Sequence, residues 1–276
     1  MDFTLTPEQE ELKTEARRWL ADRFPLDRDF DRDDDRWDEL AELGWLDVAE
    51  VGLGFVEEAL LLEEMGYALY PGPYLAHVAT GASGSERSSL EVGGFVYGGD
   101  EGDGEEVVSI DPARPLRRAA SGNGLAETPR FRAACAAEAL GVAQRALDLG
   151  VEHAKTRIQF GKPVGAYQAV AHPLAQTYTD VELSRSLAYW AAWCVAEEDE
   201  RAPVAAAAAK AVATEAAVAA CERSIQAHGG IGFTWEHPLH RFYKRALWLE
   251  GFGLRPAALQ LEVADALLGN ALLAEA

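Results

Sequence analysis

The sequence predicts a mainly α-helical protein with a shortened β region in its middle and a four-helix bundle at its C-terminal end. Two observations carry this prediction. Apolar residues recur at helical spacing before residue 80 and again after residue 129. Between these regions the composition changes to Gly, Ser and short β-type runs. We therefore expect an N-terminal helical domain at 1–80, a truncated β region at 81–128 and the bundle at 129–276.

The N-terminal region opens with a strong helix start. Thr6 can cap the helix, Pro7 suits its first position and Gln9 can complete a capping box. The Asp-rich stretch at 27–38 is typical of a solvated loop or helix face. The remaining features are a helix from Thr6 to about Phe24, helices at 37–43 and 56–67, and a break at Pro71-Gly72-Pro73 that permits one further helical turn through Leu75.

The middle region contains two predicted strands, at 94–97 and 106–110, followed by a turn at 111–115. Its glycine and charge content indicates an exposed remnant of a sheet. Helical patterns resume where Thr128 can cap and Pro129 can open a helix. Short connections between long helices predict an antiparallel bundle. Its four helices are expected at about 130–156, 166–198, 204–227 and 239–273, the last broken near 251–256.

The composition excludes several classes of function. The net charge of −21 repels polyanions, so nucleic acid is a poor partner. We expect no run of apolar residues to span a bilayer, and Met1-Asp2-Phe3-Thr4 lacks the features of a secretory signal. The three cysteines and six histidines show no metal-binding spacing. These features favour a cytoplasmic protein with no metal site and no attachment to a membrane.

Two polar segments interrupt the helical pattern. Arg157 ends a predicted helix before Gln159-Phe160-Gly161-Lys162-Pro163, where its guanidinium can meet a pyrophosphate or satisfy helix carbonyls; this segment alone supports both interpretations equally. Phe160 is expected to anchor the turn. In Gln226-x-x-Gly229-Gly230, the glycines permit close approach of a ligand, or form a tight helix end. No strand precedes these glycines, so they are not a dinucleotide fingerprint.

Taken together, the two segments resemble the acyl-CoA dehydrogenase family. The resemblance extends to Leu5-Thr6-Pro7-Glu8-Gln9 and Glu63-Glu64-Met65-Gly66, and hence covers both helical regions. It implies an N-terminal helical domain, a β domain, a four-helix bundle and bound FAD, whose ADP end reaches the bundle of a neighbouring subunit. The residues that it implies for the ADP end are Arg157, Phe160, Gln168, Gln226, Gly229 and Gly230.

The chain departs from this family in two ways. Its middle region is too short to enclose a flavin ring alone. The reaction also needs a carboxylate to remove a proton next to the thioester. The two positions where the family places its glutamate fall on Gly253 and Phe131, which cannot accept a proton. Glu250 is near the first position, and Glu138 lies about two helical turns from the second. No catalytic residue is therefore assigned.

This pattern resembles the non-catalytic subunit of heteromeric acyl-CoA dehydrogenases. The resemblance implies an α2β2 assembly with one FAD per unlike pair, in which a homologous partner supplies the catalytic Glu. It implies α,β-desaturation of a bulky acyl-CoA, steroid side chains among the substrates, with electrons passed to a separate acceptor. Two alternatives stay open: a self-sufficient homo-oligomeric enzyme that uses Glu250, and a scaffold without FAD.

Overall fold

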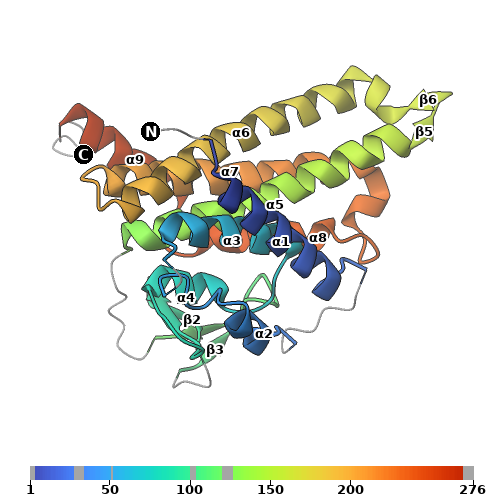
Figure 1. Cartoon of the computed structure of the whole chain (residues 1–276). Helices are drawn as coiled ribbons and strands as arrows, with labels where there is room; N and C mark the ends of the chain where they lie inside the picture. Colours follow the sequence, from blue (N-terminus) through green and yellow to red (C-terminus); the bar gives the residue numbers. More distant parts are fainter. Residues whose placement is uncertain (1–3, 28–33, 51, 100–103, 120–126, 270–276) are drawn as a thin grey trace.

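The computed structural model of the chain describes residues 4–27, 34–50, 52–99, 104–119 and 127–269 (Figure 1). Helices dominate it, and the strands are short. The helices are α1 Pro7–Arg23, α2 Trp37–Glu42, α3 Phe55–Ala68, α4 Tyr74–Thr80, α5 Pro129–Thr156, α6 Gln168–Ala196, α7 Ala202–His228, α8 Leu239–Gly251 and α9 Pro256–Leu268. The strands are β1 Ser89–Val92, β2 Phe95–Gly98, β3 Glu106–Val107, β4 Leu116–Arg118, β5 Ile158–Gln159 and β6 Lys162–Pro163.

The predicted start of α1 is confirmed. The Thr6 hydroxyl accepts a hydrogen bond from the Gln9 backbone at 3.2 Å, and the Gln9 side chain accepts one from the Thr6 backbone at 3.0 Å. Part of the Asp-rich stretch lies at 28–33, outside the described residues. The solvated interpretation is wrong for Asp35, which is 4% exposed because its carboxylate pairs with Arg87. Helix α4 is also longer than the single turn expected.

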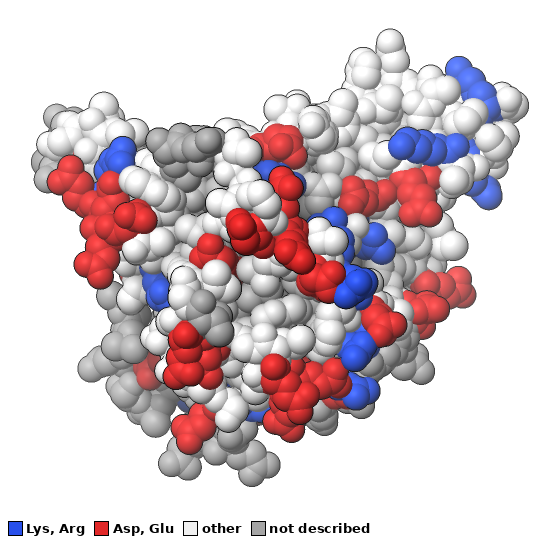
Figure 2. Space-filling view, in the orientation of Figure 1, with Lys and Arg blue, Asp and Glu red and all other residues white. Residues whose placement is uncertain are grey.

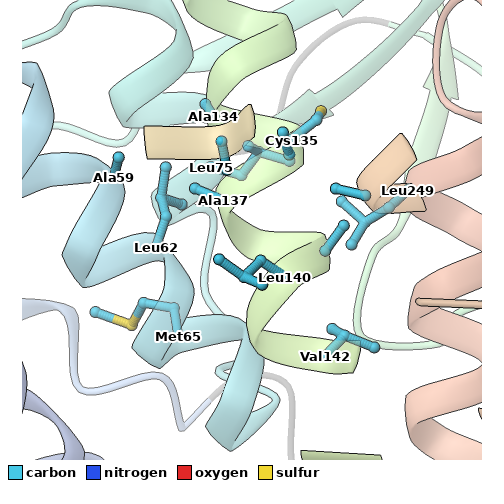
Figure 3. Close-up of a cluster of buried hydrophobic side chains, with 14 of the residues drawn as sticks. Ala59, Leu62, Met65, Leu75, Ala134, Cys135, Ala137, Leu140, Val142 and Leu249 are labelled. Carbon is cyan, nitrogen blue, oxygen red and sulfur yellow. The ribbon is translucent and has the colours of Figure 1, made fainter. Parts of the chain in front are cut away.

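Helix α3 packs against α5 with almost no space between their backbones. A Cβ at Gly66 would overlap the Glu138 carbonyl oxygen, and a Cβ at Gly141 would overlap that of Glu63. Figure 3 shows the apolar core that this approach creates, with Leu62 and Met65 facing Ala137 and Leu140, and Leu249 of α8 on the far side of α5. Glycine is required at both crossing positions because any side chain would separate the helices.

The middle region forms a four-stranded antiparallel sheet in the order β1-β2-β4-β3. The strand predicted at 94–97 matches β2, but that at 106–110 is only two residues long, and β1 and β4 were not predicted. The expectation of an exposed remnant is wrong. Leu90, Val92 and Tyr97 are buried in the main core, where the Tyr97 ring meets Trp248 of α8 edge-on at 5.0 Å.

The C-terminal half is the predicted four-helix bundle. Its long helices α5, α6 and α7 run back and forth, and its fourth member is divided into α8 and α9 by residues 252–255, as expected (Figure 1). By length and composition, the stretch Ala202–Phe233 is apolar enough to cross a membrane, with a mean hydropathy of 1.5, whereas we expected no such run. The most apolar 18 residues of this stretch are 67% buried inside the protein, where α7 packs against α5, α6 and α8.

Candidate functional site

The first segment forms a hairpin that projects beyond the bundle (Figure 1). Helix α5 ends at Arg157, and β5 pairs with β6 through a tip at which Phe160 and Gly161 have φ angles of 53° and 81°. The Phe160 side chain is 91% exposed, and its ring meets the edge of the Tyr167 ring at a centroid distance of 6.3 Å. The prediction that Phe160 anchors the turn is therefore wrong, because its ring faces outward.

The second segment ends α7 with an open glycine turn. Gly229 has a φ angle of 66°, and its N–H donates to the Gln226 and Ile225 carbonyls, so that glycine is favoured there. A Cβ added at Gly229 or Gly230 would meet nothing within 4 Å. Gly232 differs, since a Cβ there would lie 2.8 Å from that of His228. The first two glycines thus face open space, which an external group can enter.

Three histidine rings, called the histidine stack below, lie in contact where the two segments meet; His153 is stacked on His228, and His237 is tilted against His228. The rings of His153 and His228 are 4.1 Å apart, and those of His228 and His237 are 4.3 Å apart. His153 precedes Arg157 by about one turn of α5, and His228 directly precedes Gly229. Desolvation lowers the pKa of all three, and repulsion within the group helps to lower that of His237 to about 4. The stack is consequently neutral at pH 7.

The polar side chains at this end of the molecule face solvent. Arg157, Gln168 and Gln226 are all exposed, and none forms a side-chain hydrogen bond or ion pair with another described residue. Figure 2 shows basic side chains gathered at the hairpin end, on a face that is elsewhere rich in carboxylates. Those near the hairpin include Lys155, Arg157 and Lys162. This end therefore offers unpaired cations, amides and open glycines to an anionic ligand.

The two positions that lack a glutamate lie close to each other, Phe131 in the interior and Gly253 half-buried. Phe131 is 1% exposed, and its ring lies 5.8 Å from that of Phe252, the residue before Gly253. Phe252 also stacks on Trp248 at 4.5 Å and meets Tyr97 at 6.2 Å. Aromatic rings thus surround Phe131 and the residue before Gly253.

A different carboxylate occupies the space beside Gly253. A Cβ at Gly253 would overlap Glu127, whose carboxylate accepts hydrogen bonds from Lys210 at 3.2 Å, from Arg132 at 2.9 Å and from the Leu254 backbone. Lys210 also donates to the Phe252 carbonyl at 2.9 Å. With three donors, this carboxylate fixes the 252–255 connection and has little capacity left to accept a substrate proton.

Two other carboxylates, Glu138 and Glu250, lie near these positions along the chain. Glu138 is fully buried, and one carboxylate oxygen pairs with Arg114 at 2.5 Å and Arg245 at 2.7 Å. Glu250 is half-buried on α8, where desolvation and the charge of Glu215 on α7 raise its pKa. It does not line the cavity that lies between Phe24, Leu69 and Lys244.

Several of these features have no local signal in the sequence. Glu127 was missed because it stands 127 positions from Leu254, its backbone partner, and no local pattern links them. The histidine stack was missed because its members come from three separate segments. Among the described residues, no cluster of three His, Cys, Asp or Glu side chains has a metal-binding arrangement.

Comparison with known proteins gives two family matches. Residues 6–86 match the acyl-CoA dehydrogenase N-terminal domain, and residues 126–253 match the acyl-CoA dehydrogenase C-terminal domain. The acyl-CoA dehydrogenase IpdE2 of Mycobacterium tuberculosis is 33% identical over 233 residues, which cover 69% of this chain and 71% of that protein. The acyl-CoA dehydrogenase FadE34 of the same organism is 45% identical over 118 residues, or 42% of this chain and 17% of that protein.

Solved structures share the fold along almost the whole chain. A chain of the ChsE4-ChsE5 complex from Mycobacterium tuberculosis gives a TM-score of 0.75 at 22% identity, covering 97% of this chain and 99% of that one. The butyryl-CoA dehydrogenase of Megasphaera elsdenii gives 0.77 at 20% identity, covering 97% and 100%. A chain of the Tcur3481-Tcur3483 steroid ACAD variant gives 0.74 at 24% identity, covering 97% and 99%.

Proposed function

The chain belongs to the acyl-CoA dehydrogenase family, and we propose that it is the non-catalytic subunit of a heteromeric member. The observation that carries this proposal is a contrast between two parts of the same chain. The segments at the hairpin end present open glycines and unpaired polar groups. The positions of the family glutamate are instead packed with aromatic rings and with Glu127. The hairpin end is therefore open to a ligand, and the space around the glutamate positions is filled.

FAD is the cofactor that the family indicates. The hairpin end fits its ADP portion: Arg157 suits the pyrophosphate charge, and Gly229 and Gly230 leave room for a close backbone approach. Gln168 and Gln226 would add amide hydrogen bonds, and the outward ring of Phe160 would contact the cofactor. When bound, the flavin supplies the hydride acceptor, while this chain only binds and orients the ADP end.

A homologous partner would provide what this chain lacks. The short sheet β1–β4 packs its buried face on the chain's own helices, and Glu127, the carboxylate described beside Gly253, is occupied by its own hydrogen bonds. One structural relative is the ChsE4-ChsE5 complex, and another is the steroid ACAD Tcur3481-Tcur3483. We therefore favour an α2β2 assembly in the cytoplasm that desaturates a bulky acyl-CoA, such as a steroid side chain, and passes electrons to a separate acceptor.

Two alternative functions differ from this proposal, one in the residue that acts as base and the other in the absence of FAD. A self-sufficient homo-oligomer would use Glu250 as base, and Glu250→Gln would abolish its turnover. Desolvation, followed by the charge of Glu215 on α7, raises the pKa of Glu250, and this is the observation in favour of that role. A scaffold without FAD would leave Arg157 and the open glycines without a ligand.

Substitution of Arg157 tests the proposed role in cofactor binding. In the complex formed with the partner, Arg157→Met should weaken flavin binding about 10- to 150-fold, because a charge-assisted contact contributes about 1.5–3 kcal/mol. Flavin absorbance per protein after gel filtration measures this. Arg255→Met is the matched control, since Arg255 is exposed at the start of α9. Equal flavin content in the two variants would contradict the assignment.

A further inference from the structure

We propose that a cavity between the ends of α1 and α3 and the start of α8 binds a small amphipathic anion, with an apolar body and one carboxylate or sulfonate group. The cavity has a volume of about 400 Å³, within the usual range for small-molecule sites. None of the residues proposed for the ADP end of FAD lines it. The inference therefore goes beyond the proposed function and does not depend on it.

The walls of the cavity are largely apolar and come from three parts of the chain. Phe24 and Leu26 follow α1, Leu69 follows α3, and Pro112 belongs to the turn before β4. Phe24 is held in place by the Tyr70 ring, which it meets edge-on at 5.3 Å. These side chains provide a fixed hydrophobic surface that a compact apolar body can cover.

The floor of the cavity is electrically neutral. Arg245 and Asp111 both line it and form an ion pair with each other. Arg245 also binds Glu138 at 2.7 Å, and Glu138 binds Arg114 at 2.5 Å, so that two cations and two carboxylates form one closed group. Because their charges cancel, the floor neither attracts nor repels an anion strongly, and the rim decides the charge of the ligand.

Lys244 gives the rim a cation without a carboxylate. Its ammonium group lies 4.4 Å from the centre of the Trp235 ring, and it forms no ion pair with any described residue. In a chain with 46 acidic and 25 basic residues, a half-buried lysine beside an apolar cavity and without such a partner is a distinctive feature. Its long stem and point charge suit a carboxylate or sulfonate at the mouth of the cavity.

His240 supports the same position for the anionic group. It lines the cavity one turn before Lys244, and its ring nitrogens are buried with no hydrogen bond of good geometry in the described part of the chain. Desolvation, followed by the charges of Lys244 and Arg241, lowers its pKa, although a weak hydrogen bond with the Trp235 backbone acts in the opposite direction. A neutral imidazole N–H beside Lys244 can donate to an anion, which would give this buried group a full hydrogen-bond partner.

Titration with two matched ligands tests this proposal. The full chain, in complex with its partner where it is obtained that way, is titrated with decanoate and with 1-decanol while the binding of 8-anilinonaphthalene-1-sulfonate is followed by fluorescence. Decanoate should displace the dye at one site at least tenfold more effectively than decanol. Lys244→Met keeps the stem but removes the charge, and should weaken decanoate about tenfold without changing decanol.

Two further variants separate this cavity from other surfaces. Arg255→Met removes an exposed cation that does not line the cavity and should leave decanoate binding unchanged. Ala68→Phe fills part of the cavity and should weaken both ligands. The flavin content of each variant complex should match the unsubstituted protein, which keeps this test independent of the FAD assignment. The proposal is overturned if no saturable site exists, or if Lys244→Met, Ala68→Phe and Arg255→Met all bind decanoate equally.

Discussion

At the scale of single residues, the interior contains charged side chains that neutralise one another. Asp111, Arg245, Glu138 and Arg114 are buried together, and Arg114 also donates to the Tyr97 hydroxyl. Desolvation, the largest influence, raises the pKa of Tyr97, so its hydroxyl stays protonated. Such a group is stable only as long as every charge keeps its counter-charge, because the cost of burying an unpaired ion is large.

Loss of one member should therefore destabilise the fold strongly. Glu138→Gln leaves Arg114 and Arg245 with one carboxylate between them, and we expect the free energy of unfolding to fall by about 3–5 kcal/mol. Urea unfolding measures this change. Glu15→Gln, which removes half of an exposed ion pair with Arg18, should change it by about 0.5 kcal/mol or less. Similar losses in both variants would show that the buried group does not stabilise the protein.

The histidine stack makes the stability of the folded protein depend on pH. The folded pKa of His237 is about 4, below the value of about 6.5 for an unfolded histidine, so the unfolded chain binds more protons between these values. Stability from His237 is complete above about pH 6.5 and is lost as the pH falls toward 4. His153 and His228 act in the same direction.

The melting temperature at pH 7.5 and pH 5.0 checks this expectation. Glu58 opposes the effect, since desolvation raises its pKa to about 7 and its contribution falls as the pH rises. Variants isolate the stack from this background. His237→Gln should reduce the drop in melting temperature at pH 5.0, whereas His172→Gln, on an exposed part of α6, should not. A drop unchanged by His237→Gln would rule out the stack as its source.

The residues of the candidate site divide into those that sequence could predict and those that it could not. Arg157, Gln226 and Gly229 stand in local motifs, and the absence of a glutamate at Gly253 and Phe131 follows from counting along the chain. Glu127 and Lys210 are linked only by folding, across 83 positions. The direction of Phe160 also depends on the hairpin backbone, which the sequence pattern did not indicate.

At the scale of elements, the crossing of α3 and α5 fixes the positions of the N-terminal helices on the bundle. Gly66→Ala would place a methyl group against the Glu138 backbone, which cannot move aside as a side chain can. We expect a loss of about 1–3 kcal/mol in unfolding free energy, from urea denaturation. Gly251→Ala is the matched control, because its Cβ would meet nothing within 4 Å. A Gly66→Ala protein as stable as this control would contradict the close crossing.

Long helices were predictable here, and short strands were not. The caps at Thr6 and Thr128 and the prolines at helix starts give local signals that the structure reproduces. Strands β1 and β4 have four and three residues and owe their existence to pairing with β2. The run at 106–110 has strong β propensity, yet Val108 and Ile110 are exposed, and the pairing of β3 with β4 that the structure describes stops at Val107.

At the scale of the whole molecule, our proposal combines an exposed end for the cofactor and a closed reaction centre in one chain. On this proposal, the chain contributes to a reaction only when another subunit provides the rest of the flavin site. The exposed apolar residues near the hairpin end, among them Phe160, Phe233 and Trp235, are consistent with a subunit that is covered there by a partner.

The most direct test of this account is the native mass and flavin absorbance of the chain expressed alone and together with a co-encoded acyl-CoA dehydrogenase homologue. We predict a heterotetramer with one FAD per unlike pair on co-expression, and no bound flavin on the chain alone. A lone chain that forms a homo-oligomer with one FAD per subunit and oxidises an acyl-CoA would contradict it, and would make Glu250 the first residue to substitute.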